Sequence, residues 1–324
     1  MATVNTKATA LYFKSGGTLP VPTDGFIDSS EKIVWTPTTK TDKFMVINGK
    51  LGQWDSFADA GDTVIDGETI SHNVRFQNAA ADALDTVPAY GELLKASGFT
   101  ETIDTATATQ ETVIYTWDNT TQPAGGSAVF FINGKKQTFT DTLAVSSAFN
   151  ITIGEPVSFD FTISGFFDNN GIATNESNPT PPALTESVVV AQKVDILTKD
   201  GTAITGGNNV VLDMASNIVK RYGFGRGKYD STDFEPKFTV DFPPELTDYN
   251  AGIQALQAQT EVDIVMKLGT VAGVSTSGKT IEMTITNVKL LNSSDSDSDD
   301  ELSRSQEFIF TSNTAFTIKH GYYA

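Results

Sequence analysis

The chain has 324 residues, of which 39% are hydrophobic and 19% are charged, a composition typical of a folded protein and not of a disordered one. It contains no cysteine, which excludes disulfides, thiolate chemistry and cysteine-bound zinc. Its formal net charge of −18 argues against wrapping nucleic acid, because affinity for phosphate comes from lysine and arginine.

The N-terminal residues show no pattern of a targeting or membrane segment. Residues 1–20 lack the continuous apolar core of a signal peptide. No later run approaches the roughly 20 apolar residues of a membrane helix. We therefore expect a protein that is made in the cytoplasm and has no membrane partner.

Alternating apolar and polar residues predict β-strands over most of the chain. Thr, Val, Ile and Phe are frequent, and the alternating stretches lie between clusters of Gly, Asn, Asp and Pro. The clearest example runs from Val157 to Ile163, and similar patterns occur at 238–242, 281–285 and 308–318. Because one side of such a strand faces a core and the other faces water, the sequence predicts an all-β fold.

Two short helices are predicted among the strands. The first covers Pro88–Ser97, has Tyr90 on its apolar side, and is followed by Gly98 in the position that usually ends a helix. The second covers about 247–259 and begins at Thr or Asp, both of which are good N-cap residues. Each helix is expected between two strands.

The repeated order of strand, helix and strand suggests a diverged internal duplication. Tyr90 and Tyr249 occupy similar places in the two helices and lie close to half the chain apart. The turn-forming segment Pro123–Gly126 separates two strand-rich regions. We therefore predict an N-terminal β domain over 1–125 and a C-terminal β domain over 126–324.

Two polar segments are expected to form mobile loops. Asp168–Pro182 is rich in Asn, Pro and Gly, and Asn292–Ser305 reads NSSDSDSDDELSRS. Three Asp residues of the second segment have the spacing that begins a calcium loop. The segment lacks the glycine at position six and the glutamate at position twelve, so we interpret it as a solvated acidic loop.

A phosphate-loop pattern occurs at Gly273–Thr280, which reads GVSTSGKT. That pattern binds phosphate only where a helix follows it, and the residues after Thr280 alternate as a strand does. We therefore predict a hairpin turn there. The segment Gly223–Gly227 lacks the third glycine of a dinucleotide fingerprint and is also interpreted as a turn.

No residues have a spacing that is typical of catalysis or of cofactor or metal binding. The two histidines, His72 and His320, have no Asp, Glu or His at a ligand-like spacing, so both are interpreted as structural. The tryptophans Trp35, Trp54 and Trp117 are scattered and are expected in the core or in interfaces. We predict no catalytic, cofactor-binding or metal-binding residue.

Several sequence segments, taken in chain order, resemble segments of the major tail tube proteins of long-tailed (siphovirus-like) bacteriophages. They are VPAYGELLKASGF at Val87–Phe99 followed by TVIYTW, then FNITIGEPVSFDFTISGFF, then ASNIVKRYGFGRG with FEPKFTVDFP. The order and spacing carry the resemblance, which extends from about residue 43 to about residue 270. The sequence departs from the pattern at Ser97, where many members of that family have Cys.

The resemblance implies a tube-type β-sandwich or barrel present twice, in which three subunits form a pseudo-hexameric ring. Rings would stack around a channel through which DNA passes without specific binding, and an acidic wall would prevent DNA from sticking. The implied location is the phage tail in the virion. The implied partners are copies of the chain itself and other tail proteins such as the tape measure, terminator and tip.

In tube subunits a long loop between strands makes much of the contact between rings. The candidates here are Gly49–Gly67 and its counterpart Gly223–Asp233. Two other classes of protein remain open at this stage. One is a β-sandwich adhesin or carbohydrate-binding module, and the other is an enzyme, either a nucleotide hydrolase acting through Lys279 or a glycosidase acting through paired carboxylates.

Overall fold

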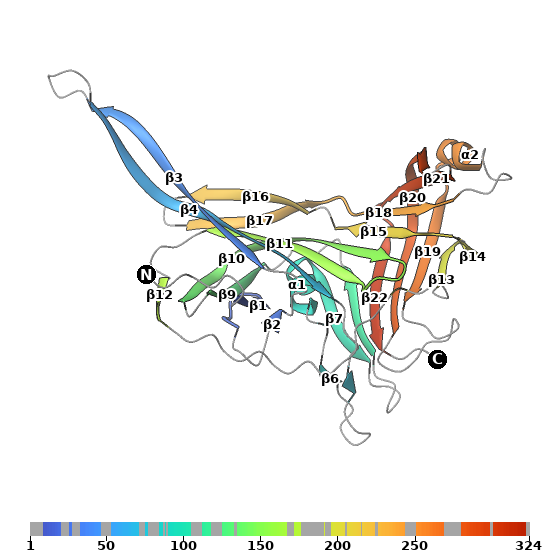
Figure 1. The fold of residues 1–324 in the computed structure, drawn as a ribbon, viewed down its shortest axis with the longest axis horizontal. Helices are drawn as coiled ribbons and strands as arrows, with labels where there is room; N and C mark the ends of the chain where they lie inside the picture. Colours follow the sequence, from blue (N-terminus) through green and yellow to red (C-terminus); the bar gives the residue numbers. More distant parts are fainter. Residues whose placement is uncertain are drawn as a thin grey trace.

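The fold is elongated and consists almost wholly of strands (Figure 1). Two short helices are the only ones among the described residues, which confirms the predicted all-β class. The computed structural model describes residues 9–20, 26–27, 33–46, 53–70, 75–76, 84–86, 88, 90–104, 112–117, 125–132, 135–166, 172–175, 191, 196–204, 206–214, 216–223, 226–243, 251–268, 280–298 and 301–321.

A long antiparallel sheet runs through the molecule. Every neighbouring pair in it is antiparallel, as expected for strands with one buried and one wet face. In order across the sheet, its strands are β3 (Val34–Val46), β4 (Gln53–Ile70), β11 (Ser158–Phe166), β10 (Lys135–Thr152), β15 (Asn209–Asp213), β18 (Lys237–Phe242), β21 (Glu301–Ile309) and β20 (Thr280–Ser298).

The two long strands β10 and β20 each take part in a second sheet. The first part of β10 pairs with β9 (Gly126–Ile132) and β12 (Ile172–Asn175), and β9 continues through β1 (Thr9–Ser15) to β2 (Phe26–Ile27). A register shift after Phe139 marks the place where β10 passes between the sheets.

The first part of β20 pairs on both sides. On one side it pairs with β19, which leads to β13 and β14, and on the other with β22, which leads to β8 and β7. These strands are β19 (Glu261–Leu268), β13 (Ile196–Lys199), β14 (Thr202–Ala203), β22 (Ala315–Gly321), β8 (Thr112–Trp117) and β7 (Phe99–Asp104).

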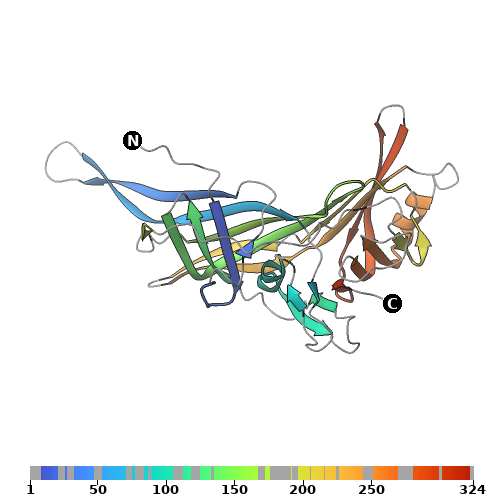
Figure 2. The same ribbon diagram turned by 60° about the horizontal axis from the view of Figure 1, so that its bottom comes forward.

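Two small ribbons complete the described strands. One pairs β16 (Ser216–Gly223) with β17 (Arg226–Phe234), and the other pairs β5 (Arg75–Phe76) with β6 (Leu84–Thr86). The β16–β17 ribbon lies against β10 and β11 (Figures 1 and 2). Both ribbons remain two-stranded among the described residues.

The predicted strand at 157–163 has the burial pattern that its sequence indicates. Val157, Phe159, Phe161 and Ile163 are buried, and the polar residues between them are partly exposed. The strands predicted at 238–242, 281–285 and 308–318 are also confirmed as β18, β20, β21 and β22. Apolar side chains from all of them join one large core.

The first predicted helix is confirmed as α1 (Gly91–Ala96), which is shorter than expected. The helix is followed by Gly98, whose φ of 100° is the left-handed conformation that ends many helices. Gly91 is needed for close packing, because a Cβ there would lie 2.2 Å from the hydroxyl of Tyr115. The second predicted helix is confirmed as α2 (Ala251–Ala258), on which Leu256 packs against the core.

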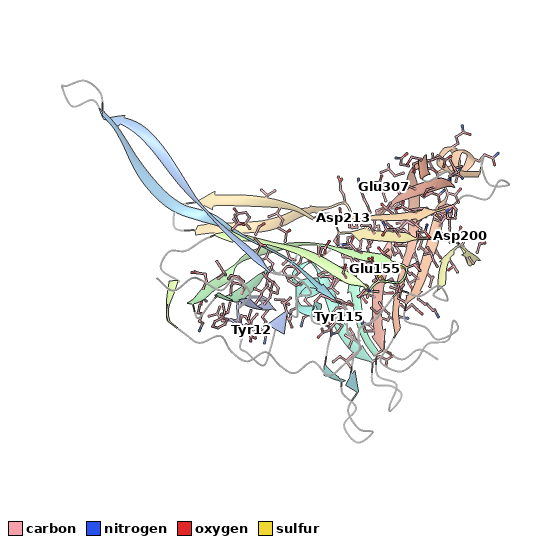
Figure 3. The ribbon with its side chains drawn as sticks, in the orientation of Figure 1. Tyr12, Tyr115, Glu155, Asp200, Asp213 and Glu307 are labelled. Atoms are coloured by element: carbon pink, nitrogen blue, oxygen red, sulfur yellow. The ribbon has the colours of Figure 1, made fainter. Side chains whose placement is uncertain are left out.

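Helix α1 is tied to both ends of the chain by polar contacts. Tyr90, just before the helix, is fully buried and shares a hydrogen bond with Nε2 of His320 on β22. The backbone N–H and the hydroxyl of Ser15 on β1 both donate to Glu92, each at 2.9 Å. Tyr115, which lies near α1 in Figure 3, donates to Glu101 on β7 at 2.7 Å. The hydrogen bonds of Tyr90 and Glu92 hold the helix against strands from distant parts of the sequence.

The predicted halves 1–125 and 126–324 share hydrogen-bonded strands. β1 pairs with β9, β4 pairs with β11, and β8 pairs with β22, so each of these pairings crosses the predicted boundary. The duplication itself stays a prediction. Neither helix of the described chain is long and apolar enough to span a membrane.

The prediction of a loop at 292–305 is wrong. Most of this segment lies in β20 and β21, which pair from Lys289 and Ile309 out to Ser298 and Glu301. Its alternating Ser and Asp residues suit the two-residue period of a strand, and pairing with β21 outweighs their low strand propensity. Of the other predicted loop, 168–182, the structure describes only 172–175, which form β12.

Burial of His320 predicts a specific loss of stability in acid. Burial lowers the pKa of this side chain from 6.5 to about 3, and the groups in ring contact with it, Tyr90 and Tyr115, stay neutral in acid. Below about pH 6.5, His320 becomes protonated in the unfolded chain but stays neutral in the folded chain. The free energy of unfolding therefore falls by about 1.4 kcal/mol per pH unit from this group alone.

Urea unfolding of wild type and of His320→Gln at pH 7, 6 and 5 measures this effect, since the carboxylates are common to both chains. The difference between the two stabilities should shrink as the pH falls. A constant difference would contradict a neutral, buried His320.

Candidate self-assembly surface

The β3–β4 hairpin extends well beyond the sheet to which it belongs. β4 pairs with β11 only from Asp62 to Ile70, whereas its pairing with β3 continues from Asp66 out to Gln53. Residues 53–61 and the facing part of β3 therefore form a two-stranded ribbon, roughly 30 Å long at about 3.3 Å per residue. Figures 1 and 2 show it projecting away from the body of the molecule.

Both edges of this ribbon lack a neighbouring strand within the described chain. β3 pairs only with β4, and no described strand pairs with the outer side of β4 before Asp62. A two-stranded hairpin alone is marginally stable in water. Unpaired backbone N–H and C=O groups along a strand edge invite another strand or chain. The ribbon is therefore a surface suited to contact with another molecule.

The β16–β17 ribbon is a second surface of this kind. Its strands pair with each other from Ser216–Phe234 to Gly223–Arg226, and no other described strand joins them. Ile218 is half-buried and Val219 is exposed, so one face of the ribbon lies toward β10 and β11 and the other lies outward. The arrows of β3 and β16 point toward the same end of the long axis (Figure 1).

These two hairpins contain the segments that the resemblance to tail tube proteins implied as candidates for contacts between subunits. Gly49–Gly67 and Gly223–Asp233 were expected to be loops, but the structure places most of each in paired strands, so the expectation of a loop is wrong. The link between β16 and β17 confirms that Gly223–Gly227 spans a turn. The tips themselves, 47–52 and 224–225, lie outside the described residues.

The sequence contains a signal for the first hairpin that our sequence analysis missed. Asn48–Gly49 lies between the segments that pair as β3 and β4, and Asn133–Gly134 lies between β9 and β10. Asn-Gly between two strand-like segments is the strongest short-range signal of a β-hairpin. Applied at Asn48, it predicts paired strands in place of a loop.

The phosphate-loop pattern occurs in the wrong structural context for binding phosphate. β20 begins at Thr280, so a strand and not a helix follows the pattern. β19 and β20 are antiparallel neighbours with Leu268 opposite Ile281, which confirms a hairpin connection between them. The connecting residues 269–279, including Lys279, lie outside the described part of the chain.

The acidic run at 295–301 lies at the end of the β20–β21 hairpin. Asp295 accepts hydrogen bonds from Nε and Nη2 of the buried Arg304 at 2.7 and 3.1 Å. The bond from Arg304 lowers the pKa of Asp295, so this carboxylate is charged and already paired. Asp299 and Asp300 lie outside the described residues.

The histidines and tryptophans are found in structural positions where they are described. His320 is buried in β22, which agrees with a structural role, and His72 lies outside the described residues. Trp117 packs edge-on against Phe310 with ring centroids 5.7 Å apart. The backbones of Trp35 and Trp54 lie in β3 and β4, opposite Ile65 and Met45.

Comparison with protein-family models finds no match to this chain, and comparison with curated proteins finds none either.

Unequal pairing along β4 predicts unequal hydrogen exchange in the unassembled chain. Amides of 62–70 lie between two neighbouring strands, whereas among the described strands those of 53–61 have a neighbour on one side only. Exchange measured by mass spectrometry should therefore be faster over 53–61 by at least about tenfold. Equal protection of the two segments in dilute monomer would show that the ribbon already has a partner within the chain.

Proposed function

We propose that this chain is a structural subunit that assembles with copies of itself, and that the assembly is the tail tube of a long-tailed bacteriophage. The observation that carries the proposal is the β3–β4 ribbon, a projecting pair of strands whose outer edges have no described partner. Contact with the next subunit would cover those edges, as closure of a sheet does within one chain.

The resemblance to tail tube proteins supports this choice among structural proteins. The sequence segments that carry the resemblance coincide with elements that hold the fold together. VPAYGELLKASGF contains α1 and the buried Tyr90, and FNITIGEPVSFDFTISGFF contains the end of β10 and all of β11. The turn between β10 and β11 includes Gly154, whose φ of 90° suits glycine. The resemblance therefore rests on residues with identifiable structural roles.

The charge of the chain is compatible with a channel for DNA. A subunit with a net charge of −18 repels phosphate, so DNA could pass without being held. In this proposal three subunits form each ring, rings stack head to tail, and the remaining partners are the tape measure, terminator and tip proteins of the tail. The tube is part of the virion, and the chain has no catalytic residue or cofactor.

Negative-stain electron microscopy of the purified chain at increasing concentration tests the proposal. We expect stacked rings or hollow tubes with a channel wide enough for DNA. A chain that stays monomeric at every concentration and binds glycans would favour the adhesin instead.

Shortening the β3–β4 hairpin should abolish polymerisation without unfolding the subunit. The whole of Gly49–Gly67 is unsuitable for deletion, because Asp62–Gly67 pair with β11 in the central sheet. Removing 41–58 and joining Lys40 to Asp59, which lie opposite each other, by an Asn-Gly turn leaves that pairing intact. Sedimentation and microscopy should show a folded monomer at concentrations where wild type forms tubes.

A matched control replaces 269–279, between β19 and β20, with a short Gly-Ser linker. This variant should still polymerise. Normal tubes from the chain lacking 41–58 would refute a role for the hairpin in assembly.

A further inference from the structure

Strand β7 forms one edge of the sheet that continues through β8, β22, β20 and β19. Its six residues, Phe99–Asp104, all pair with β8 without a register shift. No described strand pairs with the other side of β7. Four of its residues are exposed, namely Thr100, Thr102, Ile103 and Asp104. That side of β7 is therefore a place where a strand of another molecule can add.

The core-facing side of β7 contains an apolar residue that its own sheet leaves partly uncovered. His320 on β22, Val113 on β8 and Ile103 on β7 lie opposite one another in one row across the sheet. His320 and Val113 are buried, whereas Ile103 is 41% exposed. A further strand beside β7 would continue the row and cover Ile103, which is favourable for an apolar side chain.

The carboxylate of Glu101 does not protect this edge. Charged residues that point inward guard many natural edge strands against strand addition. Glu101, however, accepts a hydrogen bond from the hydroxyl of Tyr115 at 2.7 Å and lies 3.6 Å from Nζ of Lys95 on α1. Its charge is thus compensated within the chain, and the same contacts hold β7 in place before a partner arrives.

The other described edges outside the β3–β4 ribbon are shorter or less regular. β2 and β14 have two residues each, and β12 pairs with β10 through a register shift. The β20–β21 hairpin projects beyond Arg304, where its pairing with β18 ends, and β20 has a register shift after Leu290. Short strands and bulges commonly blunt an edge. β7 has no bulge, proline or lysine, so it obstructs strand addition least.

β7 and the β3–β4 ribbon are separate surfaces of the molecule. Figures 1 and 2 show β7 below the long sheet and the ribbon projecting from its left end. No described pairing joins the two. Contact between two different surfaces joins copies head to tail, because each copy added still presents a ribbon or a β7 edge to another.

We infer that the edge of β7 in one copy receives the β3–β4 ribbon of the next copy as an added strand. This inference rests on the proposed self-assembly and names the surface that the ribbon contacts. Main-chain hydrogen bonds hold an added strand of this kind, as they do where an extended peptide adds to a sheet edge. The contact supplies a partner to the edge of β7 and to the edge of the ribbon together.

A lysine at the edge of β7 tests the contact, because edge lysines oppose strand addition. The test variant is Ile103→Lys. The matched control is Leu19→Lys, since Leu19 is 40% exposed and follows β1 outside any strand. We expect Ile103→Lys to need at least about tenfold more protein than wild type to polymerise. Leu19→Lys should polymerise as wild type does, and circular dichroism should show both variants folded.

Disulfide crosslinking locates the contact directly, because the chain has no cysteine of its own. One chain carries Thr102→Cys, and a second chain carries one cysteine at a time over 41–45 or 54–60 of the ribbon. In oxidised mixtures, crosslinks should appear at alternate positions of one ribbon strand, since residues two apart share a face. Thr18→Cys, at another exposed threonine, replaces Thr102→Cys as the control and should give no crosslink.

Wild-type polymerisation is measured in parallel by light scattering and microscopy. Three outcomes would each overturn the inference and leave the proposed function standing: polymerisation of Ile103→Lys at the wild-type concentration, an equal loss of assembly in Leu19→Lys, or no alternating crosslinks to Thr102→Cys. Failure of wild type to assemble at any concentration would overturn the proposed function itself.

Discussion

The organising constraint in this chain is that backbone groups along a strand edge need partners. The long strands β10 and β20 meet it by pairing with different neighbours along their length, which joins separate sheets into one body. Among the described strands, none pairs with the outer side of β3 or of the first part of β4. A projecting ribbon whose edges lack a described partner is a place where another strand or chain can add, and this is the basis of the proposed self-assembly.

The interior shows how the body of the fold is held together. Helix α1 is held through Glu92 by β1 and through Tyr90 by β22, so elements near both ends of the chain converge on one short helix. Tyr90 also packs against Phe149 and Phe159, with ring centroids 5.3 and 4.9 Å apart. Burying these polar groups is favourable only because they are hydrogen-bonded. The ribbons project from this fixed core.

Sequence predicts this fold best where a strand has one buried and one wet face. Phe159 and Phe161 show that case, because burial follows directly from the two-residue period. Prediction from sequence fails for β4. Its Ala, Gly and Asp residues have low strand propensity, and they form a strand because they pair with β3. It fails at Asp295 for the same reason, since pairing with β21 and the bond to Arg304 decide the outcome. Both failures lie on projecting hairpins.

That coincidence has a physical basis. A strand in the core is specified by its own apolar residues, whereas a strand at a contact surface must stay soluble before assembly and so carries polar and charged residues. The outer part of β4 shows the consequence, because its Ala, Gly and Asp residues have low strand propensity of their own. The segments whose local pattern contradicts their structure are therefore the segments at which a partner is expected.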